Sequence, residues 1–307
     1  MKTLISTNYC RKKIFLGLFL TFFLFVIGCT STPKSSNKWP EKVLRKLSLR
    51  EKIAQMMIYR MHLKYENITS EKWAEITELI SSDGIGGIHL WSGDGSSSLA
   101  FINEIQKRSK VPIIFDADIE RGFGQRFPSG TDFPPMMAIT ATGNPKNAYE
   151  VGRIVATESR AAGVHWNLSP VVDVNNNPLN PIINTRSFSE NPDIVSEFSL
   201  EYTKGLQDFG MIATAKHFPG HGDTQTDSHS SLAMIPSDSS RLWSLELKPF
   251  MAMAEADIDV VMVAHVHAPD YQPEADEPAT LSSFWVTDIL KNRLEFSGAI
   301  ITDAMGM

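Results

Sequence analysis

The most informative segment of this chain is Met211-Ile212-Ala213-Thr214-Ala215, followed by Lys216-His217-Phe218-Pro219-Gly220-His221-Gly222-Asp223-Thr224. The five small or apolar residues predict a buried β-strand, and the segment after them, rich in Pro and Gly, predicts a loop. Loops held by a rigid scaffold commonly carry binding and catalytic side chains. This loop closes on Asp227-Ser228-His229, where a carboxylate could hold one ring nitrogen while the other handles a proton.

The same order, an apolar run and then polar residues, recurs along the chain. The polar residues that follow such runs are Asp116 and Asp118, Asp173, Lys216 and His217, His265 and His267, and Asp303. The predicted strands are 55–58, 86–90, 112–115, 165–172, 211–215, 260–264 and 299–302. The predicted helices are 71–82, 98–109, 145–162, 192–209, 239–256 and 283–293. Alternating strands and helices predict a parallel sheet covered by helices.

Two architectures share this alternation, the doubly wound sheet and the eight-stranded barrel. In a barrel the carboxyl ends of all strands meet on one face, so the polar residues would converge there. No Gly-x-Gly-x-x-Gly turn follows a predicted strand, which weakens the dinucleotide-binding alternative. The sequence therefore predicts an α/β fold of the TIM-type (β/α)8 barrel. Because seven strands precede Met307, we expect the barrel to be truncated after strand seven.

The first residues predict a targeting segment and not part of the fold. Lys2 and the run Arg11-Lys12-Lys13 form a positive region, and 14–27 is an apolar stretch too short for a comfortable membrane span. Val26-Ile27-Gly28-Cys29 resembles a bacterial lipobox, in which the cysteine is lipidated. We expect a lipoprotein signal peptide at 1–28, a flexible tether at 29–40 and one folded domain at 41–307, anchored to a bacterial membrane of the cell envelope. An ordinary cleaved signal remains the alternative.

Charge and cysteine content exclude several function classes. The formal net charge of −6 becomes −10 once 1–28 is removed, and no basic block remains, which argues against a nucleic-acid partner. Cys10 and Cys29 both lie near the N-terminus, so the folded part has no disulfide framework and no cysteine metal site. The sequence gives no indication of oligomeric state.

The loop that begins at Lys216 and ends at His229 resembles the defining loop of the bacterial β-N-acetylglucosaminidases of glycoside hydrolase family 3. Other family members, such as the β-glucosidases, usually lack the Asp-Ser-His segment and draw their acid/base glutamate from a second domain. The loop therefore favours the amino-sugar branch. The resemblance covers nearly all of 41–307, which would be the family's N-terminal catalytic barrel.

A second segment, Asp118-Ile119-Glu120-Arg121-Gly122-Phe123-Gly124-Gln125-Arg126, resembles the family's Asp-x-Glu-Gly-Gly-Arg-Val-x-Arg motif. The first Asp and the last Arg of that motif contact the terminal sugar, and Asp118 and Arg126 keep both ends. Arg121 and Phe123 depart from the family's Gly and Arg at the rim of the pocket.

Three more substrate contacts follow from the resemblance. The stretch from Ser169 to Phe188 matches the family and implies that Arg186 binds sugar. Lys216 and His217 occupy substrate-contact positions. Hydrogen bonds from these charged groups to hydroxyls would hold the sugar in place for attack, and no cofactor is implied.

The catalytic residues implied by the resemblance are Asp303, His229 and Asp227. Ile301-Thr302-Asp303-Ala304-Met305 is similar to the strand-end segment that carries the nucleophile, which nominates Asp303. The family gives the acid/base role to a histidine, here His229. Asp227 would orient that ring and raise its pKa. The implied reaction is retaining, exo-acting release of β-linked N-acetylglucosamine, from peptidoglycan fragments or from other glycans.

Other interpretations stay open for several residues and for the function. Asp173 and 175–177 favour turn chemistry, and His265 and His267 favour packing at a strand end. Histidines 217, 221 and 229 could suggest zinc, but they lack helical His-x-x-x-His spacing, so we expect no metal. The functional alternatives are a β-glucosidase-like exo-hydrolase and a sugar-binding lipoprotein without turnover.

Overall fold

The computed structural model of the chain describes residues 38–63, 67, 69–226, 232–236, 239–272 and 277–307. Two compact units can be distinguished, Met1–Leu47 and Ser48–Met307. The first contains helix α2 (Trp39–Lys46), which begins with a proline in its first turn. The predicted signal peptide and Cys29 lie outside the described residues. No helix in the described part of the chain has the length and apolar character needed to cross a bilayer.

The second unit is built on a seven-stranded sheet in which every neighbouring pair is parallel. In spatial order its strands are β1 (Ile58–Leu63), β2 (Gly87–Gly93), β3 (Ile114–Ala117), β4 (Trp166–Asn167), β5 (Ile212–Phe218), β7 (Val260–Val263) and β9 (Ala299–Thr302). Spatial order follows chain order, as in a barrel wall. A small parallel pair, β6 (Ala233–Met234) and β8 (Val266–His267), lies outside this sheet.

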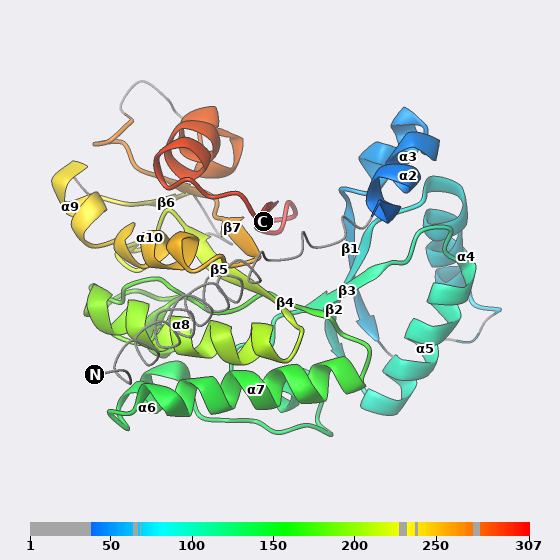
Figure 1. Cartoon of the computed structure of the whole chain (residues 1–307), viewed down its shortest axis with the longest axis horizontal. Helices are drawn as coiled ribbons and strands as arrows, with labels where there is room; N and C mark the ends of the chain where they lie inside the picture. The colour runs from blue at the N-terminus through cyan, green and yellow to red at the C-terminus, as the bar shows by residue number, and fades with distance from the viewer. Residues whose placement is uncertain (1–37, 64–66, 68, 227–231, 237–238, 273–276) are drawn as a thin grey trace, which may run out of the picture. The chain divides into compact units, whose positions relative to one another are not determined.

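Helices connect the strands and cover the outer face of the sheet (Figure 1). They are α3 (Leu49–Ala54), α4 (Glu71–Glu78) with its π-helical extension η1 (Leu79–Asp83), α5 (Gly95–Arg108), α6 (Met136–Thr140), α7 (Pro145–Ala161), α8 (Pro192–Asp208), α9 (Ser239–Ser244), α10 (Lys248–Glu255) and the π-helical η5 (Phe284–Arg293). Short 3-10 turns are η2 (Phe123–Gln125), η3 (Asn184–Arg186) and η4 (Ala279–Leu281). The predicted start of α7 is confirmed, because the Asn144 side chain accepts from the Lys146 backbone N–H and Pro145 occupies the first turn.

The inner strands β2, β3, β4, β5 and β7 are largely buried on both faces, as the strands of a barrel are, whereas the edge strands β1 and β9 are partly exposed. Outward residues such as Ile88 and Phe115 belong to the large core between sheet and helices. Inward residues form a second cluster of Trp166, Leu168, Val260 and Met262, against which Ile58, Ile114, Ile212 and Ile301 pack. The indole N–H of Trp166 donates to the Thr214 hydroxyl at 2.7 Å within this inner layer. The predicted fold class, a TIM-type barrel of which seven strands are present, is confirmed.

Some predicted boundaries were wrong, each for a local reason. Residues 55–57 do not begin a strand, because they follow helix α3, which a Ser48–Glu51 capping box starts. The strand predicted at 165–172 is short, since Pro170 has no N–H for a ladder. The helix predicted at 239–256 is two helices, α9 and α10, and Pro249 lies in the first turn of the second.

The backbones of helices α7 and α8 approach each other closely where the helices cross, at Gly152 and Gly205. A Cβ atom on Gly152 would lie 2.3 Å from the carbonyl oxygen of Tyr202, and one on Gly205 would lie 2.2 Å from that of Tyr149. Each glycine therefore faces the backbone of the other helix. This crossing sets the position of Tyr202, whose side chain is fully buried and reaches the loop after β3.

Candidate active site

A cavity of about 850 Å³ lies inside the curled sheet. Its lining changes in character along the strands. Apolar side chains such as Ile58, Leu168 and Met262 line one part, and charged side chains at the carboxyl ends of the strands line the other. Five of the residues predicted to act on the sugar line this cavity together with Asp303: they are Asp118, Arg126, Arg186, Lys216 and His217.

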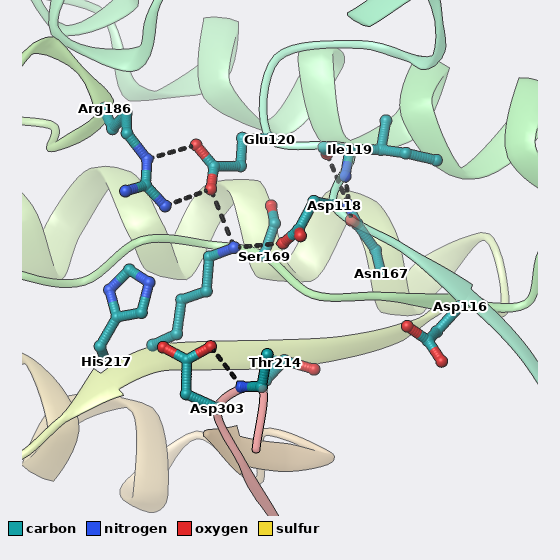
Figure 2. A network of polar contacts seen from close by, with 12 residues as sticks. Asp116, Asp118, Ile119, Glu120, Asn167, Ser169, Arg186, Thr214, His217 and Asp303 are labelled. Carbon is teal, nitrogen blue, oxygen red and sulfur yellow. Dashed lines mark hydrogen bonds and ion pairs between the residues drawn. The ribbon is translucent and has the colours of Figure 1, made fainter. Parts of the chain in front are cut away.

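Asp118, Glu120 and Arg186 belong to a charged network (Figure 2), and Lys216 is at its centre. The strand predicted at 211–215 continues as β5 to Phe218, so Lys216 and His217 lie in the strand and not in the loop after it. Strand alternation sends Ala213 and Ala215 outward and the Lys216 side chain inward. Its ammonium lies 2.6 Å from Asp118 Oδ1 and 2.8 Å from Glu120 Oε1, and the residue is only 2% exposed.

Glu120 joins this lysine to Arg186. The guanidinium of Arg186 donates from Nε to Glu120 Oε2 at 3.0 Å and from its terminal nitrogen to Oε1 at 2.7 Å, a bidentate pair. Burial disfavours the charge of Glu120, but Lys216 and Arg186 outweigh burial and hold the pKa of this carboxyl well below its ordinary value. Burial lowers the pKa of the Lys216 ammonium, but the charges of Asp118 and Glu120 outweigh burial and raise it. All four groups are therefore charged at neutral pH.

Uncharged side chains hold the backbone segment that carries Asp118 and Glu120. The Asn167 side chain exchanges two hydrogen bonds with the backbone of Ile119, at 3.0 and 2.8 Å. The Tyr202 hydroxyl donates to the Glu120 carbonyl at 3.0 Å and accepts from Ser169 Oγ at 2.9 Å. The two carboxylates are thus mounted on a rigid segment before any ligand binds.

Arg126 approaches Asp118 differently from Lys216. Its Nε donates to the Asp118 backbone carbonyl at 3.0 Å, and its terminal nitrogen lies 3.9 Å from Asp118 Oδ2. The guanidinium is 4.5 Å from the centroid of the Trp91 ring. Arg121, which replaces a family glycine, lies at the rim of the cavity and pairs with Asp132 at 3.3 Å.

Asp173 holds the ring of His217 in place. This contact corrects the prediction that Asp173 serves a local turn. Asp173 is fully buried, and its Oδ2 lies 2.6 Å from Nδ1 of His217. Its Oδ1 accepts from the backbone N–H of His221 at 2.7 Å and of His217 at 3.3 Å. Burial would raise the pKa of this carboxyl, but His217 reverses the direction and lowers it. The partners of Asp173 lie 44 and 48 residues away, so a reading of local sequence could not find them.

Asp303 follows strand β9 directly and lines the same cavity as Lys216 and His217. Its backbone N–H donates to the Val263 carbonyl at 2.9 Å, which extends the β7–β9 ladder by one residue. Its Oδ1 accepts from the Ala304 N–H at 2.8 Å. Nearby, His265 packs against this segment, because its Nε2 lies 3.2 Å from the Ala304 carbonyl and its Nδ1 lies 2.8 Å from Thr280 Oγ1.

Asp227 and His229, the expected acid/base pair, lie outside the described residues. Within the part of the chain that the structure describes, no group of three or more His, Cys, Asp or Glu side chains is arranged to hold a metal ion. Sequence reasoning missed the roles of Glu120, His89 and Asp116, all of which line the cavity. Glu120 could have been found, because it stands two residues after Asp118 on the same face of an extended segment.

The chain is similar to known proteins in sequence and in structure. Residues 48–307 match the sequence model described as "Glycosyl hydrolase family 3 N terminal domain". A protein named Beta-hexosaminidase, from Stenotrophomonas maltophilia, is 34% identical over 248 residues, which cover 78% of this chain and 72% of that protein. Beta-hexosaminidase A of Pseudoalteromonas piscicida is also 34% identical, over 257 residues, and the match covers 76% of this chain and 43% of that protein.

A solved structure described as a glycoside hydrolase family 3 beta-N-acetylglucosaminidase, from a Paenibacillus species, superposes with a TM-score of 0.77. Its sequence is 34% identical, and the match covers 85% of this chain and 50% of that chain. The chain thus spans half or less of the length of two of these three relatives.

Proposed function

The chain belongs to glycosyl hydrolase family 3, and on that basis we propose that it carries the active site of a retaining, exo-acting β-N-acetylhexosaminidase. The two relatives named as hexosaminidases and the one described as a beta-N-acetylglucosaminidase support the amino-sugar specificity. The substrate is a glycan that ends in β-linked N-acetylglucosamine.

One observation carries the proposal. The carboxylate of Asp303 lines the same cavity as a set of polar and charged side chains that fit sugar hydroxyls, formed by Asp118, Arg126, Arg186, Lys216 and His217. A retaining glycosidase needs a carboxylate beside a sugar site of this kind, positioned to attack the anomeric carbon. Lys216 is buried and already paired with Asp118 and Glu120, so its orientation is set before the substrate arrives.

The reaction then runs in two displacements. Asp303 attacks the anomeric carbon, the bond to the aglycone oxygen breaks, and His229 gives that oxygen a proton. In the second step His229 takes a proton from water, which displaces Asp303 and releases the sugar. Asp227 holds the ring of His229 in the required orientation. Lys216, Arg186 and Asp118 bind sugar hydroxyls through both steps.

A panel of nitrophenyl glycosides tests the activity. The N-acetyl-β-glucosaminide should release nitrophenol, whereas the β-glucoside should release it at least about tenfold more slowly, as expected when a site built for one polar group meets an analogue that lacks it. Asp303→Asn should abolish release, and the exposed control Asp288→Asn should not. Equal rates on both sugars would favour a β-glucosidase-like hydrolase, and no release on either would favour a binding protein.

The location is part of the proposal. The lipobox-like sequence before Cys29 supports a lipid anchor that holds the enzyme at the cell envelope, where peptidoglycan fragments and imported glycans are both available. Cys29→Ser should release the protein from the membrane fraction or leave an unprocessed precursor, and Cys10→Ser should change neither. A wild-type protein that is already soluble after fractionation would contradict the anchor.

A further inference from the structure

Two titratable side chains that the proposed reaction does not use lie together in the inner layer of the barrel. His89 on β2 and Asp116 on β3 are register partners, and their neighbours Ile88 and Phe115 face the outer core. Strand alternation therefore places both side chains inside the curled sheet. His89 is 8% exposed and Asp116 is 1% exposed.

The ring of His89 lies between two carboxylates. Its Nδ1 is 2.5 Å from Asp116 Oδ1, and its Nε2 is 3.8 Å from Asp118 Oδ2. The other oxygen of Asp116, Oδ2, is buried and has no hydrogen-bond partner among the described residues. Among the described residues, His89 is therefore the hydrogen-bond partner of the Asp116 carboxylate. The second ring nitrogen, Nε2, is directed at the sugar-binding carboxylate of Asp118.

These two contacts determine which protonation state of His89 is favourable in the site. A neutral ring that donates from Nδ1 to Asp116 would turn an unprotonated Nε2 toward the Asp118 carboxylate, which is repulsive. A protonated ring presents N–H groups to both carboxylates. Burial opposes the charged ring, but the hydrogen bond and charge of Asp116, with the charge of Asp118, raise the pKa of His89. Burial also raises the pKa of Asp116, and the hydrogen bond and charge of His89 oppose that rise.

Cationic side chains on other strands also bear on the charge of the ring. Lys216 from β5 is the cation that opposes protonation of His89. Arg60, the register partner of His89 on β1, places its guanidinium over the Trp91 ring, 5.2 Å from its centroid. Asp118 Oδ1 binds Lys216, while Oδ2 lies at nearly equal distances from His89, 3.8 Å, and from Arg126, 3.9 Å. His89 is thus one of two cationic groups on that oxygen.

We propose that His89, held by Asp116, is a positioning residue that fixes the Asp118 carboxylate in the orientation required for binding the terminal sugar. The inference rests on the proposed sugar site, and it identifies the His89–Asp116 pair as a determinant of how tightly that site binds sugar. Loss of either member leaves Arg126 as the remaining charged group on Oδ2 of Asp118, so that the carboxylate is held less firmly. Binding then weakens as the pH rises through the pKa of His89, because the proton on Nε2 is lost.

Kinetics on the full-length protein test the proposal with His89→Gln and Asp116→Asn. His165→Gln is the matched control, because His165 is an exposed histidine just before β4, at the amino end of that strand. Both dyad variants should raise KM for the nitrophenyl N-acetyl-β-glucosaminide about tenfold, because the Asp118 carboxylate loses one of its charged neighbours, and change kcat less than about threefold. In wild type KM should rise with pH, and in His89→Gln this rise should vanish. A KM within about twofold of the control for both variants would overturn the proposal.

A histidine NMR titration tests the same coupling without turnover. The His89 ring protons should titrate above the ordinary histidine value of about 6.5, and Asp116→Asn and Asp118→Asn should each lower the His89 midpoint. A His89 midpoint at or below the ordinary value, or one that Asp118→Asn leaves unchanged, would overturn the proposal. If the wild-type protein cleaves no aryl glycoside, the proposed function fails, and this titration alone decides whether His89 acts on Asp118.

Discussion

The ammonium of Lys216, on β5, lies 2.6 Å from a carboxylate oxygen of Asp118, which follows β3. The two residues are 98 positions apart in the chain, and strand β4 separates their strands in the sheet. Their contact therefore depends on the curl of the sheet, which turns the carboxyl ends of the strands toward one interior. The same contact links the sugar site to the stability of the fold.

Lys216→Met should destabilise the protein by about 3 kcal/mol, because it leaves Asp118 and Glu120 buried without their shared cation. Urea unfolding at pH 7 measures the change. Lys146→Met, at an exposed position on α7, is the control and should change stability by less than about 0.5 kcal/mol. If the two variants unfold at the same urea concentration, the buried network does not stabilise the fold.

The network also predicts how stability depends on pH. The folded pKa values of Asp118 and Glu120 are both lowered, so their contribution is fully present above the unfolded values, near about 4. That contribution is lost as the pH falls through this region toward the folded values. The free energy of unfolding should therefore decrease from about pH 5 downward, and more steeply in wild type than in Asp118→Asn. Identical slopes in the two proteins would be incompatible with the lowered pKa of Asp118.

Asp173→Asn should damage binding as well as stability, because an amide cannot accept both from the His217 ring and from two backbone N–H groups. We expect a loss of about 2 kcal/mol in unfolding free energy and a rise in KM of about tenfold. Asp288→Asn, exposed on η5, serves as the control for both measurements. A variant with unchanged KM would show that the orientation of His217 does not depend on Asp173.

Gly205→Ala should loosen the crossing of α7 and α8, since the added methyl would lie 2.2 Å from the Tyr149 carbonyl oxygen. The helices must separate, at a cost of about 1–3 kcal/mol, the usual range for overpacking. Glu197→Ala, on the exposed face of α8, should cost less than about 0.5 kcal/mol. Thermal unfolding compares the two variants, and equal melting temperatures would mean that α8 moves without penalty.

Much of the fold follows from sequence periodicity, and the exceptions have physical causes. The runs at 86–90 and 260–264 are predicted as strands because they are mostly apolar, as strands buried on both faces are. The run at 299–302 is predicted on the same ground, although Ala299 and Thr302 are exposed. Strand β1 was misplaced because Tyr59-Arg60-Met61-His62 alternates, with Met61 in the outer core and Arg60 at the cavity. Because Arg60 is a polar residue on the inner face, this segment lacks the continuous apolar run expected of a strand that is buried on both faces.

The site was predictable where a motif names a residue and not where a contact depends on register. Asp118, Lys216 and Arg186 were found through the family resemblance, and all three line the cavity. The pairing of His89 with Asp116 follows from the register of β2 against β3, which no local pattern encodes. The support of His217 by Asp173 likewise depends on how β5 passes the loop after β4.

The most direct test of the central claim is identification of the residue that bonds to the sugar. The protein is incubated with a 5-fluoro derivative of N-acetylglucosamine carrying an activated leaving group, then digested, and its peptides are weighed by mass spectrometry. Double displacement predicts one added sugar on the peptide that contains Asp303, with no adduct in Asp303→Asn. An adduct on another carboxylate, or hydrolysis of the parent nitrophenyl substrate to the inverted anomer, would contradict the assignment of Asp303 as the nucleophile.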